Sequence, residues 1–271
     1  MNAIPGPAAA AVSRPRRGPL PPPRKDHYLS LPDANVMGTA AMKETLANLG
    51  EVIDARGMMC LYGPAGLGKT MSVNASLREL APRATRRIEF RGRPTVLDIR
   101  RNLFNVLGLP GSPPRQPTAF DTLLKDVLAE EFRVLVCDEA QWLREESFEY
   151  FRHLFDDLYT DIAVVFVGGG NTYQVLSRKD MLASRVHIWQ EFTPLTRVEV
   201  LTTIPAYHPV WQAVDPDDLL YADDVAAHGV FRTWAKITYH VKRALENNPD
   251  LEVDRNLLRW VFSKLGRHNQ P

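Results

Sequence analysis

Hydrophobic residues along this chain occur in short runs that alternate with segments in which they recur every three or four positions. Short apolar runs bounded by polar or glycine-rich residues predict strands, whereas the wider spacing predicts amphipathic helices. The predicted strands are residues 58–62, 87–90, 134–137 and 162–167, with a weaker candidate at 188–192. The predicted helices are residues 39–56, 69–80, 96–107, 119–130 and 147–159. This alternation is typical of an α/β fold, in which helices cover a parallel sheet.

The pattern changes toward both ends of the chain. From residue 197 it contains helices alone, the last at 254–265. The first 25 residues carry seven prolines and five Arg or Lys but no acidic residue, so they cannot bury a core. Such a segment is either a solubilising tail or a basic arm that touches nucleic acid or a partner. We predict a disordered arm over 1–30, an α/β core over 31–195 and a helical domain over 196–271.

Composition narrows the possible classes of protein. The formal net charge is +1, with 33 Lys and Arg against 32 Asp and Glu, so the overall charge does not argue for a nucleic-acid partner. Cys60 and Cys137 both lie in apolar runs, which predicts buried reduced thiols and not disulfides or metal ligands. No apolar run approaches the ~20 residues that a membrane-spanning helix needs. Prolines and arginines near the N-terminus are unlike a secretory signal, which favours a cytoplasmic location.

The strongest chemical signal is the segment GPAGLGKT, which lies between the strand at 58–62 and the helix at 69–80. In a phosphate-binding loop, glycines let backbone N–H groups converge on a phosphate at a helix N-terminus. The lysine then reaches the β- and γ-phosphates, and the following Thr binds Mg²⁺. The alternative is a glycine-rich turn that binds nothing. The predicted nucleotide-binding residues are Gly63, Pro64, Ala65, Gly66, Leu67, Gly68, Lys69, Thr70 and Met71.

Two carboxylates follow the apolar strand at 134–137. Asp138 and Glu139 stand at its C-terminal end, which is the edge where open α/β sheets bind ligands. We expect Asp138 to join Thr70 at the Mg²⁺ and Glu139 to activate the attacking water, because hydrolysis needs a carboxylate that the metal does not occupy. Two acids after a strand are by themselves also typical of a solvated loop, and the preceding phosphate loop decides for the functional interpretation.

Three further residues complete the predicted site. Asn171, after the strand at 162–167 and three glycines, is either a sensor of the γ-phosphate or water, or the cap of the next helix. Arg185 is either an arginine finger for a neighbouring subunit or a surface ion pair. Arg232, at a helix start in the helical domain, either reaches the phosphates from a lid or has a structural role. The predicted catalytic residues are thus Glu139, Lys69, Asn171, Arg185 and Arg232.

The order of these motifs, from the phosphate loop through the Asp-Glu strand to Asn171, Arg185 and Arg232, resembles that of the AAA+ superfamily over about residues 35 to 265. The words GMM before the loop, DEAQWL, VGGGN and MLASRV are most similar to the transposition ATPases of the TniB, TnsC and MuB group. The resemblance implies a three-layer αβα sandwich with a helical lid, bound ATP and Mg²⁺, and an ATP-dependent homo-oligomer that forms a ring or a filament. It also implies binding to double-stranded target DNA and recruitment or activation of a transposase of the DDE integrase type.

The resemblance places DNA contacts on basic residues around the pore of the assembly. The candidates in this chain are Arg91, Arg93, Arg100, Arg101 and Arg115, and the alternative is an ordinary solvated face. Arg83, Arg86 and Arg87 precede this cluster. Two other functions share the ATP site. A replication loader or initiator-like ATPase is one, although no winged-helix pattern follows the helical domain. A slow nucleotide switch is the other, although Glu139 favours turnover.

Overall fold

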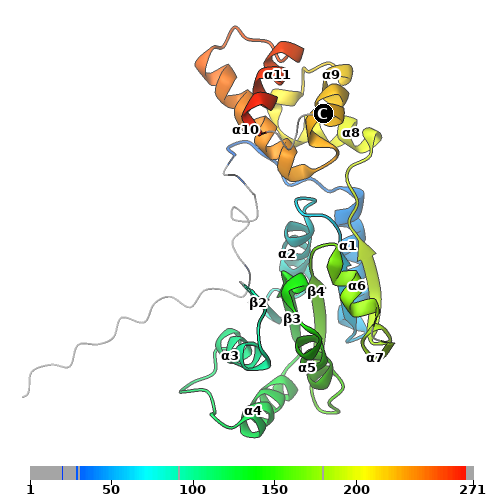
Figure 1. Ribbon diagram of the computed structural model, residues 1–271, viewed down its shortest axis with the longest axis vertical. Coiled ribbons are helices and arrows are strands. Elements are labelled where there is room, and N and C mark those ends of the chain that lie inside the picture. The colour runs from blue at the N-terminus through cyan, green and yellow to red at the C-terminus, as the bar shows by residue number, and fades with distance from the viewer. Residues whose placement is uncertain (1–19, 21–28, 30, 91, 179, 267–271) are drawn as a thin grey trace, which may run out of the picture.

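Five parallel strands form the centre of the molecule (Figure 1). The computed structural model describes Leu20, Leu29 and residues 31–90, 92–178 and 180–266. The strand order is β2-β3-β4-β1-β5, and every neighbouring pair is parallel. The strands are β1 (Met58–Tyr62), β2 (Thr85–Glu89), β3 (Arg133–Asp138), β4 (Ile162–Val167) and β5 (Val186–Glu191). The predicted parallel α/β fold is confirmed, while most of the predicted N-terminal arm lies outside the described residues.

Side chains on the central strands alternate between two separate cores, because successive residues of a strand point to opposite faces. On β4, Val164 and Phe166 pack into one core, whereas Val165 and Val167 pack into the other. Both faces of the sheet are therefore dry, which explains why β3 and β4 read as continuous apolar runs and not as alternating ones.

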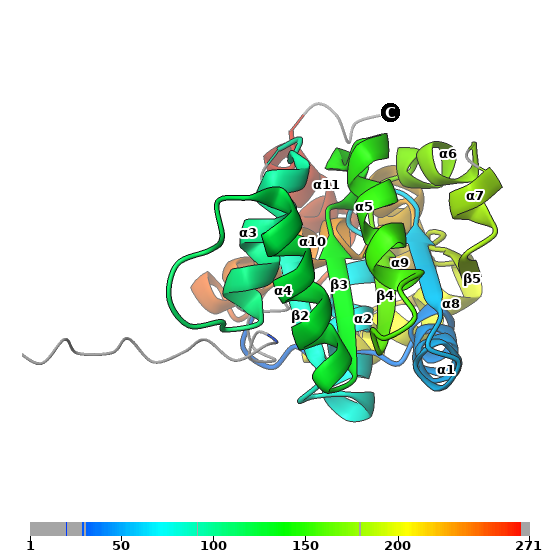
Figure 2. The same ribbon diagram turned by 90° about the horizontal axis from the view of Figure 1, so that it is seen from below.

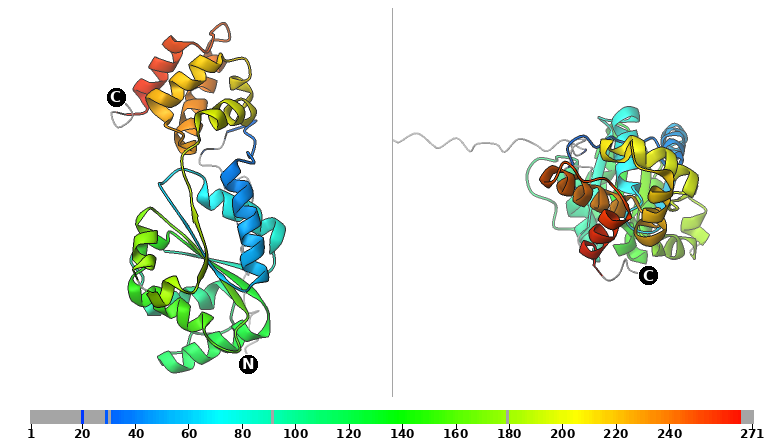
Figure 3. Two further views of the ribbon diagram at one scale, coloured as in Figure 1. Left: turned by 90° about the vertical axis from the view of Figure 1, so that its right-hand side faces the viewer. Right: turned by 90° about the horizontal axis from the view of Figure 1, so that it is seen from above.

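Helices cover both faces and make the three layers (Figures 2 and 3). One face is covered by α1 and α2, and the other by α3 to α7. These helices are α1 (Ala40–Asp54), α2 (Lys69–Leu80), α3 (Val96–Val106), α4 (Pro117–Glu130), α5 (Glu145–Phe155), α6 (Asn171–Ser177) and α7 (Asp180–Ala183). None of the helices in the described part of the chain is long and apolar enough to cross a membrane.

Element boundaries differ from prediction where tertiary contacts decide them. Strand β2 begins two residues early, because Thr85 pairs with Val134 of β3 and its hydroxyl donates to Ala81 O. Helix α5 ends at Phe155, four residues early. Thr160 donates to the carbonyl of Leu154 and closes that end, while the next loop leaves Leu158 exposed. Helix α4 begins at Pro117, where the missing N–H of proline costs no hydrogen bond.

A separate helical lid stands beyond one end of the sheet (Figure 1). Trp211 and Trp234 pack edge to face in its core, with ring centroids 5.3 Å apart. The segment before α1 joins this lid through Asn35, whose backbone N–H donates to Tyr207 O at 2.9 Å. The lid helices are α8 (Arg197–Tyr207), α9 (Pro216–Ala222), α10 (Phe231–Asn247) and α11 (Arg255–Lys264), with a π-helical turn at Asp223–Ala227.

Candidate nucleotide-binding site

The phosphate loop leaves β1 and enters α2 in a conformation that requires glycine. Gly63, Gly66 and Gly68 have φ values of +134°, +87° and +101°, which residues with a side chain rarely adopt. A Cβ on Gly63 would also lie 2.4 Å from the carbonyl oxygen of Phe192. The N-cap position of α2 is Gly68, which makes no side-chain capping bond. The amides of the first turn of α2 are therefore in place for an anionic ligand.

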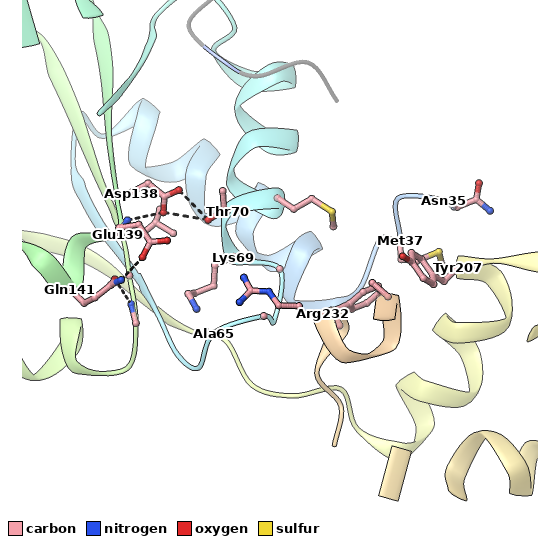
Figure 4. Close-up of a pocket in the computed structure, with 18 residues that line it drawn as sticks. Asn35, Met37, Ala65, Lys69, Thr70, Asp138, Glu139, Gln141, Tyr207 and Arg232 are labelled. Atoms are coloured by element: carbon pink, nitrogen blue, oxygen red, sulfur yellow. Dashed lines mark hydrogen bonds between the residues drawn. The ribbon is translucent and has the colours of Figure 1, made fainter. Parts of the chain in front are cut away.

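Lys69 lies in the concavity of this loop (Figure 4). Its ammonium donates to Gly63 O at 2.8 Å and to Pro64 O at 2.7 Å. Burial lowers the pKa of Lys69 to about 8, and the positive charge of Arg232 adds to this effect, while Asp138 and Glu139 oppose it. The loop thus holds a partly desolvated lysine, and a negatively charged ligand would stabilise its protonated form.

This perturbed lysine predicts a pH dependence for nucleotide binding. ATP binds the protonated ammonium, so affinity is complete below the free-protein pKa of about 8 and falls as pH rises above it. We expect the Kd for ATP to weaken by up to about tenfold per pH unit in this range, measured by calorimetry at constant ionic strength. Lys69→Arg is the matched control, since its charge persists and no decline is expected. An unchanged Kd up to about pH 9.5 in the wild type would contradict the prediction.

Thr70 and Asp138 form the candidate Mg²⁺ site. The Thr70 hydroxyl lies 3.3 Å and 3.2 Å from the two carboxylate oxygens of Asp138, at the mouth of the phosphate loop. Burial raises the pKa of Asp138, and the charge of Arg87 and the N–H of Glu139 oppose that shift. Two hard oxygen donors converge here beside the phosphate loop, which fits Mg²⁺ shared between protein and phosphate.

Arg87 is a candidate site residue that the sequence pattern does not identify. In sequence it is one of the basic residues that precede the candidate DNA contacts, yet in the structure its guanidinium pairs with Asp138 and donates to Asn74. Only 12% of its side chain is exposed. Glu89 of β2 lies opposite Asp138 of β3. Arg87 is two residues before Glu89 and therefore points to the same face of the sheet, next to the Asp138 carboxylate. The strand pattern alone did not reveal which strand neighbours β3.

Glu139 occupies a backbone conformation that is uncommon for a residue with a side chain. Its φ is +56°, and the position is held by its own N–H, which donates to Asp138 Oδ1 at 2.9 Å, and by its carbonyl, which accepts from Trp142 N at 3.0 Å. Sparsely populated backbone conformations concentrate at functional sites. The Glu139 carboxylate accepts a hydrogen bond from the side-chain amide of Gln141, and both residues line the same cavity.

Asn171 is placed less favourably. It is exposed in the first turn of α6 and is not among the described residues that line the cavity. Gly170 takes the N-cap position of this helix, so Asn171 is not the cap of α6 either. Its role as a sensor stays a prediction.

Arg232 reaches the site from the lid. Its backbone N–H donates to Gly66 O at 2.9 Å, and its side chain points toward Lys69 (Figure 4). The turn before it is fixed by Asp223, whose buried carboxylate accepts from Gly229 N and from Trp234 Nε1. A side chain on Gly229 would collide with the backbone of Leu195. Contacts of the lid core therefore set where Arg232 lies.

The cavity extends from the phosphate loop to an apolar end formed by the lid and by the segment before α1 (Figure 4). Asn35 and Met37 come from that segment, and Tyr207, Phe231 and Ala235 from the lid. Tyr207 and Phe231 contact each other edge to face. These residues carry no recognisable motif, and the sequence interpretation missed them because they meet only after the lid has folded against the core.

Arg185 lies at the N-terminal end of the strands, whereas the phosphate loop lies at their C-terminal end. It precedes β5, whose Val186 pairs with Met58 at the start of β1, whereas the phosphate loop follows the end of β1. The five residues of β1, at about 3.3 Å each, separate the two ends of the sheet, so Arg185 cannot reach the phosphate loop of its own chain. In the single chain it forms an ion pair with Asp156 at 2.9 Å, which is the alternative interpretation of this residue.

The candidate DNA-binding arginines differ in how accessible they are. Arg100 is committed to Asp121 through two contacts of 2.7 Å and lies over the ring of Tyr150. Arg93, Arg101 and Arg115 are exposed on or beside α3 and on the following loop. Arg91 lies outside the described residues. Their role in DNA binding stays a prediction.

The five-stranded parallel sheet with its covering helices has the AAA+ P-loop nucleoside triphosphatase fold. Residues 53–176 match the family model described as an AAA domain. No protein of curated function matches this chain in sequence.

Similar solved structures include ORC1 of Aeropyrum pernix in complex with DNA, with a TM-score of 0.66, 18% identity, and coverage of 90% of this chain and 69% of that one. Drosophila ORC bound to DNA has a TM-score of 0.65, 16% identity, and coverage of 98% and 70%. The RuvB Holliday junction branch migration motor of Thermotoga maritima has a TM-score of 0.57, 16% identity, and coverage of 86% and 72%. At these identities the likeness concerns the fold.

Proposed function

We propose that this chain hydrolyses ATP to ADP and phosphate in the presence of Mg²⁺. The observation that carries this proposal is the convergence of Lys69, the Thr70–Asp138 pair and Glu139 on a single cavity, which Arg232 lines from the lid. Each chemical requirement of phosphoryl transfer to water has a residue of the right type: a phosphate cradle, a metal site, and a carboxylate beside them.

The residues divide the work by their contacts. Main-chain amides at the start of α2 and the ammonium of Lys69 bind the phosphates. Thr70 and Asp138 would hold Mg²⁺, which would supply positive charge next to the phosphates. Glu139 orients the attacking water and accepts its proton. The apolar end of the cavity excludes water around the nucleobase of ATP. Arg232 makes closure of the lid depend on bound phosphate.

Phosphate release from ATP tests this proposal directly. We expect Mg²⁺-dependent turnover that is lost on chelation, with GTP measured in parallel because the apolar end of the cavity does not by itself define the base. A folded sample that binds neither nucleotide in the presence of Mg²⁺ would refute the proposal.

We further propose that the protein assembles with ATP on double-stranded DNA and recruits or activates a transposase of the DDE integrase type. The words shared with the TniB, TnsC and MuB group support the transposition role. Arg185 supports assembly, since it lies too far from the phosphate loop of its own chain and is exposed at the other edge of the sheet. The exposed Arg93, Arg101 and Arg115 support a DNA contact.

Sedimentation with duplex DNA and a slowly hydrolysed ATP analogue tests assembly. We expect oligomers that need both nucleotide and DNA, with an affinity for DNA that falls steeply as salt rises, because each neutralised phosphate releases counterions. A permanent monomer under all conditions would sink this part of the proposal. Electron microscopy of the same sample separates a ring from a filament.

Arg185→Ala should leave ATP binding within about threefold of wild type, because exposed ion pairs such as Arg185–Asp156 contribute about 0.2–1 kcal/mol and do not touch the nucleotide. The rise of the hydrolysis rate per subunit with protein concentration should disappear, since removing an arginine finger costs about 10³-fold or more. Arg178→Ala, at the C-cap of α6, is the matched control. A mutant whose rate still rises with concentration like wild type would argue against the finger.

A loader or initiator-like ATPase of DNA replication remains the second candidate, and the likeness of fold to ORC1 and ORC favours it. The two functions predict different partners. The transposition role predicts a neighbouring reading frame for an integrase-like transposase, and predicts that this enzyme binds the ATP-loaded oligomer. Stimulation of strand transfer by wild type but not by Lys69→Ala would decide for transposition.

A further inference from the structure

The two residues that follow strand β4 near Glu139 are glycines and carry no side chains. Gly168 and Gly169 follow Val167 and line the cavity. Gly168 is buried, and a Cβ on it would lie 2.1 Å from the Thr172 hydroxyl and 3.0 Å from the backbone nitrogen of Gln141. A polar group that acts on Glu139 at this place must therefore come from another element.

Gln141 fills this space from the short 3-10 turn Ala140–Trp142 that follows Glu139. Its Nε2 donates to the carboxylate of Glu139, and its Oε1 accepts from the N–H of Gly169 at 2.8 Å. The two partners fix the orientation of the amide, because a carboxylate can only accept and a backbone N–H can only donate. Figure 4 shows the side chain between Glu139 and the loop that follows β4.

The two acids at the end of β3 have separate partners. Asp138 is held by Thr70 and Arg87, whereas one carboxylate oxygen of Glu139 is held by Gln141. Anchoring one oxygen of a carboxylate limits its rotation and leaves the other oxygen to accept a proton. Bonding to Gly169 also ties the position of Glu139 to the β4–α6 loop.

We propose that Gln141 is the residue that positions Glu139 for hydrolysis and links it to the β4–α6 loop. This inference rests on the proposed ATPase function. Gln141 acts through Glu139 and does not itself handle a proton. It is a positioning residue, a role different from the sensing of the γ-phosphate or water that the sequence predicts for Asn171.

Gln141→Met tests the inference, because methionine keeps the length of the side chain and removes both hydrogen bonds. We expect kcat to fall by about 10- to 100-fold, as a small misplacement of a reacting group can cost about 10² in rate. The KM and the Kd for ATP should stay within about threefold, since the contacts of Gln141 go to Glu139 and Gly169 and not to the phosphate loop. Gln174→Met, an exposed glutamine on α6, is the matched control.

A double-mutant cycle distinguishes positioning from general stabilisation. If Gln141 acts through Glu139, then Gln141→Met in a Glu139→Gln background should add no further loss, whereas independent effects would multiply. Thermal unfolding verifies that the variants are folded, and Gln141→Leu serves as a second variant should the methionine not fold.

Each outcome of this experiment decides. A normal kcat for Gln141→Met and Gln141→Leu, multiplicative losses in the double mutant, or a loss in Asn171→Ala without one at Gln141 would overturn the inference while the ATPase stands. Wild-type protein that binds ATP but never turns it over would overturn the proposed function and this inference together.

Discussion

Glu139→Gln is expected to lower ATP turnover by about 10²- to 10⁴-fold, the range that a positioned general base contributes. Glutamine keeps the size and the hydrogen-bonding reach of the side chain but cannot accept a proton from water. Lys69, Thr70 and Asp138 are untouched, so the Kd for ATP should stay close to wild type. The variant should therefore remain in its ATP-bound state and assemble on DNA for longer.

Single-turnover hydrolysis with excess protein measures this effect, because it separates the chemical step from product release. Glu146→Gln, an exposed glutamate near the start of α5, is the matched control and should turn over normally. Equal single-turnover rates for Glu139→Gln and wild type would remove Glu139 from the mechanism. The protein would then be the slow nucleotide switch that the same motifs also allow.

Lys69→Ala should weaken ATP binding by about 10²- to 10⁴-fold, because hydrogen bonds to charged groups contribute about 1.5–3 kcal/mol each and the ammonium would make more than one. The substitution also removes the hydrogen bonds to Gly63 O and Pro64 O that Lys69 makes within the loop. Both losses act on the same cradle, so every nucleotide-dependent property should disappear with ATP binding.

Fluorescence titration with a labelled ATP analogue gives the affinity, and melting without nucleotide verifies that the variant is folded. Lys43→Ala, an exposed lysine on α1, is the matched control. In wild type and in this control, saturating ATP should raise the melting temperature, since a ligand that binds the native state stabilises it. An unchanged ATP affinity in Lys69→Ala would contradict the phosphate-loop assignment.

The two variants differ in what they separate. Lys69→Ala removes binding and with it all later steps, whereas Glu139→Gln preserves binding and stops the chemistry. If the Glu139→Gln variant assembles and the Lys69→Ala variant does not, then assembly is controlled by bound ATP and not by its hydrolysis.

The elements around the phosphate loop were predictable from sequence because their signals are local. Strand β1 and helix α2 have the predicted bounds, and all three glycines of the phosphate-loop motif have positive φ. The parallel α/β fold was also predictable, since apolar runs on strands buried on both sides differ from the alternating pattern of half-exposed ones. Helix α3 begins at residue 96 as predicted, and the structure shows a capping box of Thr95 and Asp98 at this start.

Residues whose role depends on which strands are neighbours were not predictable. Arg87 reads as one of several arginines, and only the pairing of β2 with β3 turns it toward Asp138. Gln141 belongs to the segment DEAQWL with no role of its own predicted, and the glycines after β4 leave space for its side chain between Glu139 and Gly169. Strand order is a long-range property, so no short window of the sequence specifies the contacts of Arg87 with Asp138 and of Gln141 with Gly169.

By itself, the sequence determined the phosphate loop, its flanking strand and helix, and the carboxylates Asp138 and Glu139, because backbone conformation and periodicity follow from residues close together in the chain. Tertiary structure decided which side chains those groups meet. It paired Arg87 with Asp138, joined Gln141 to Glu139, and brought Asn35, Tyr207 and Phe231 to the far end of the cavity. These contacts join residues far apart in sequence or depend on the packing of the sheet and lid, and their geometry exists only once those layers have formed.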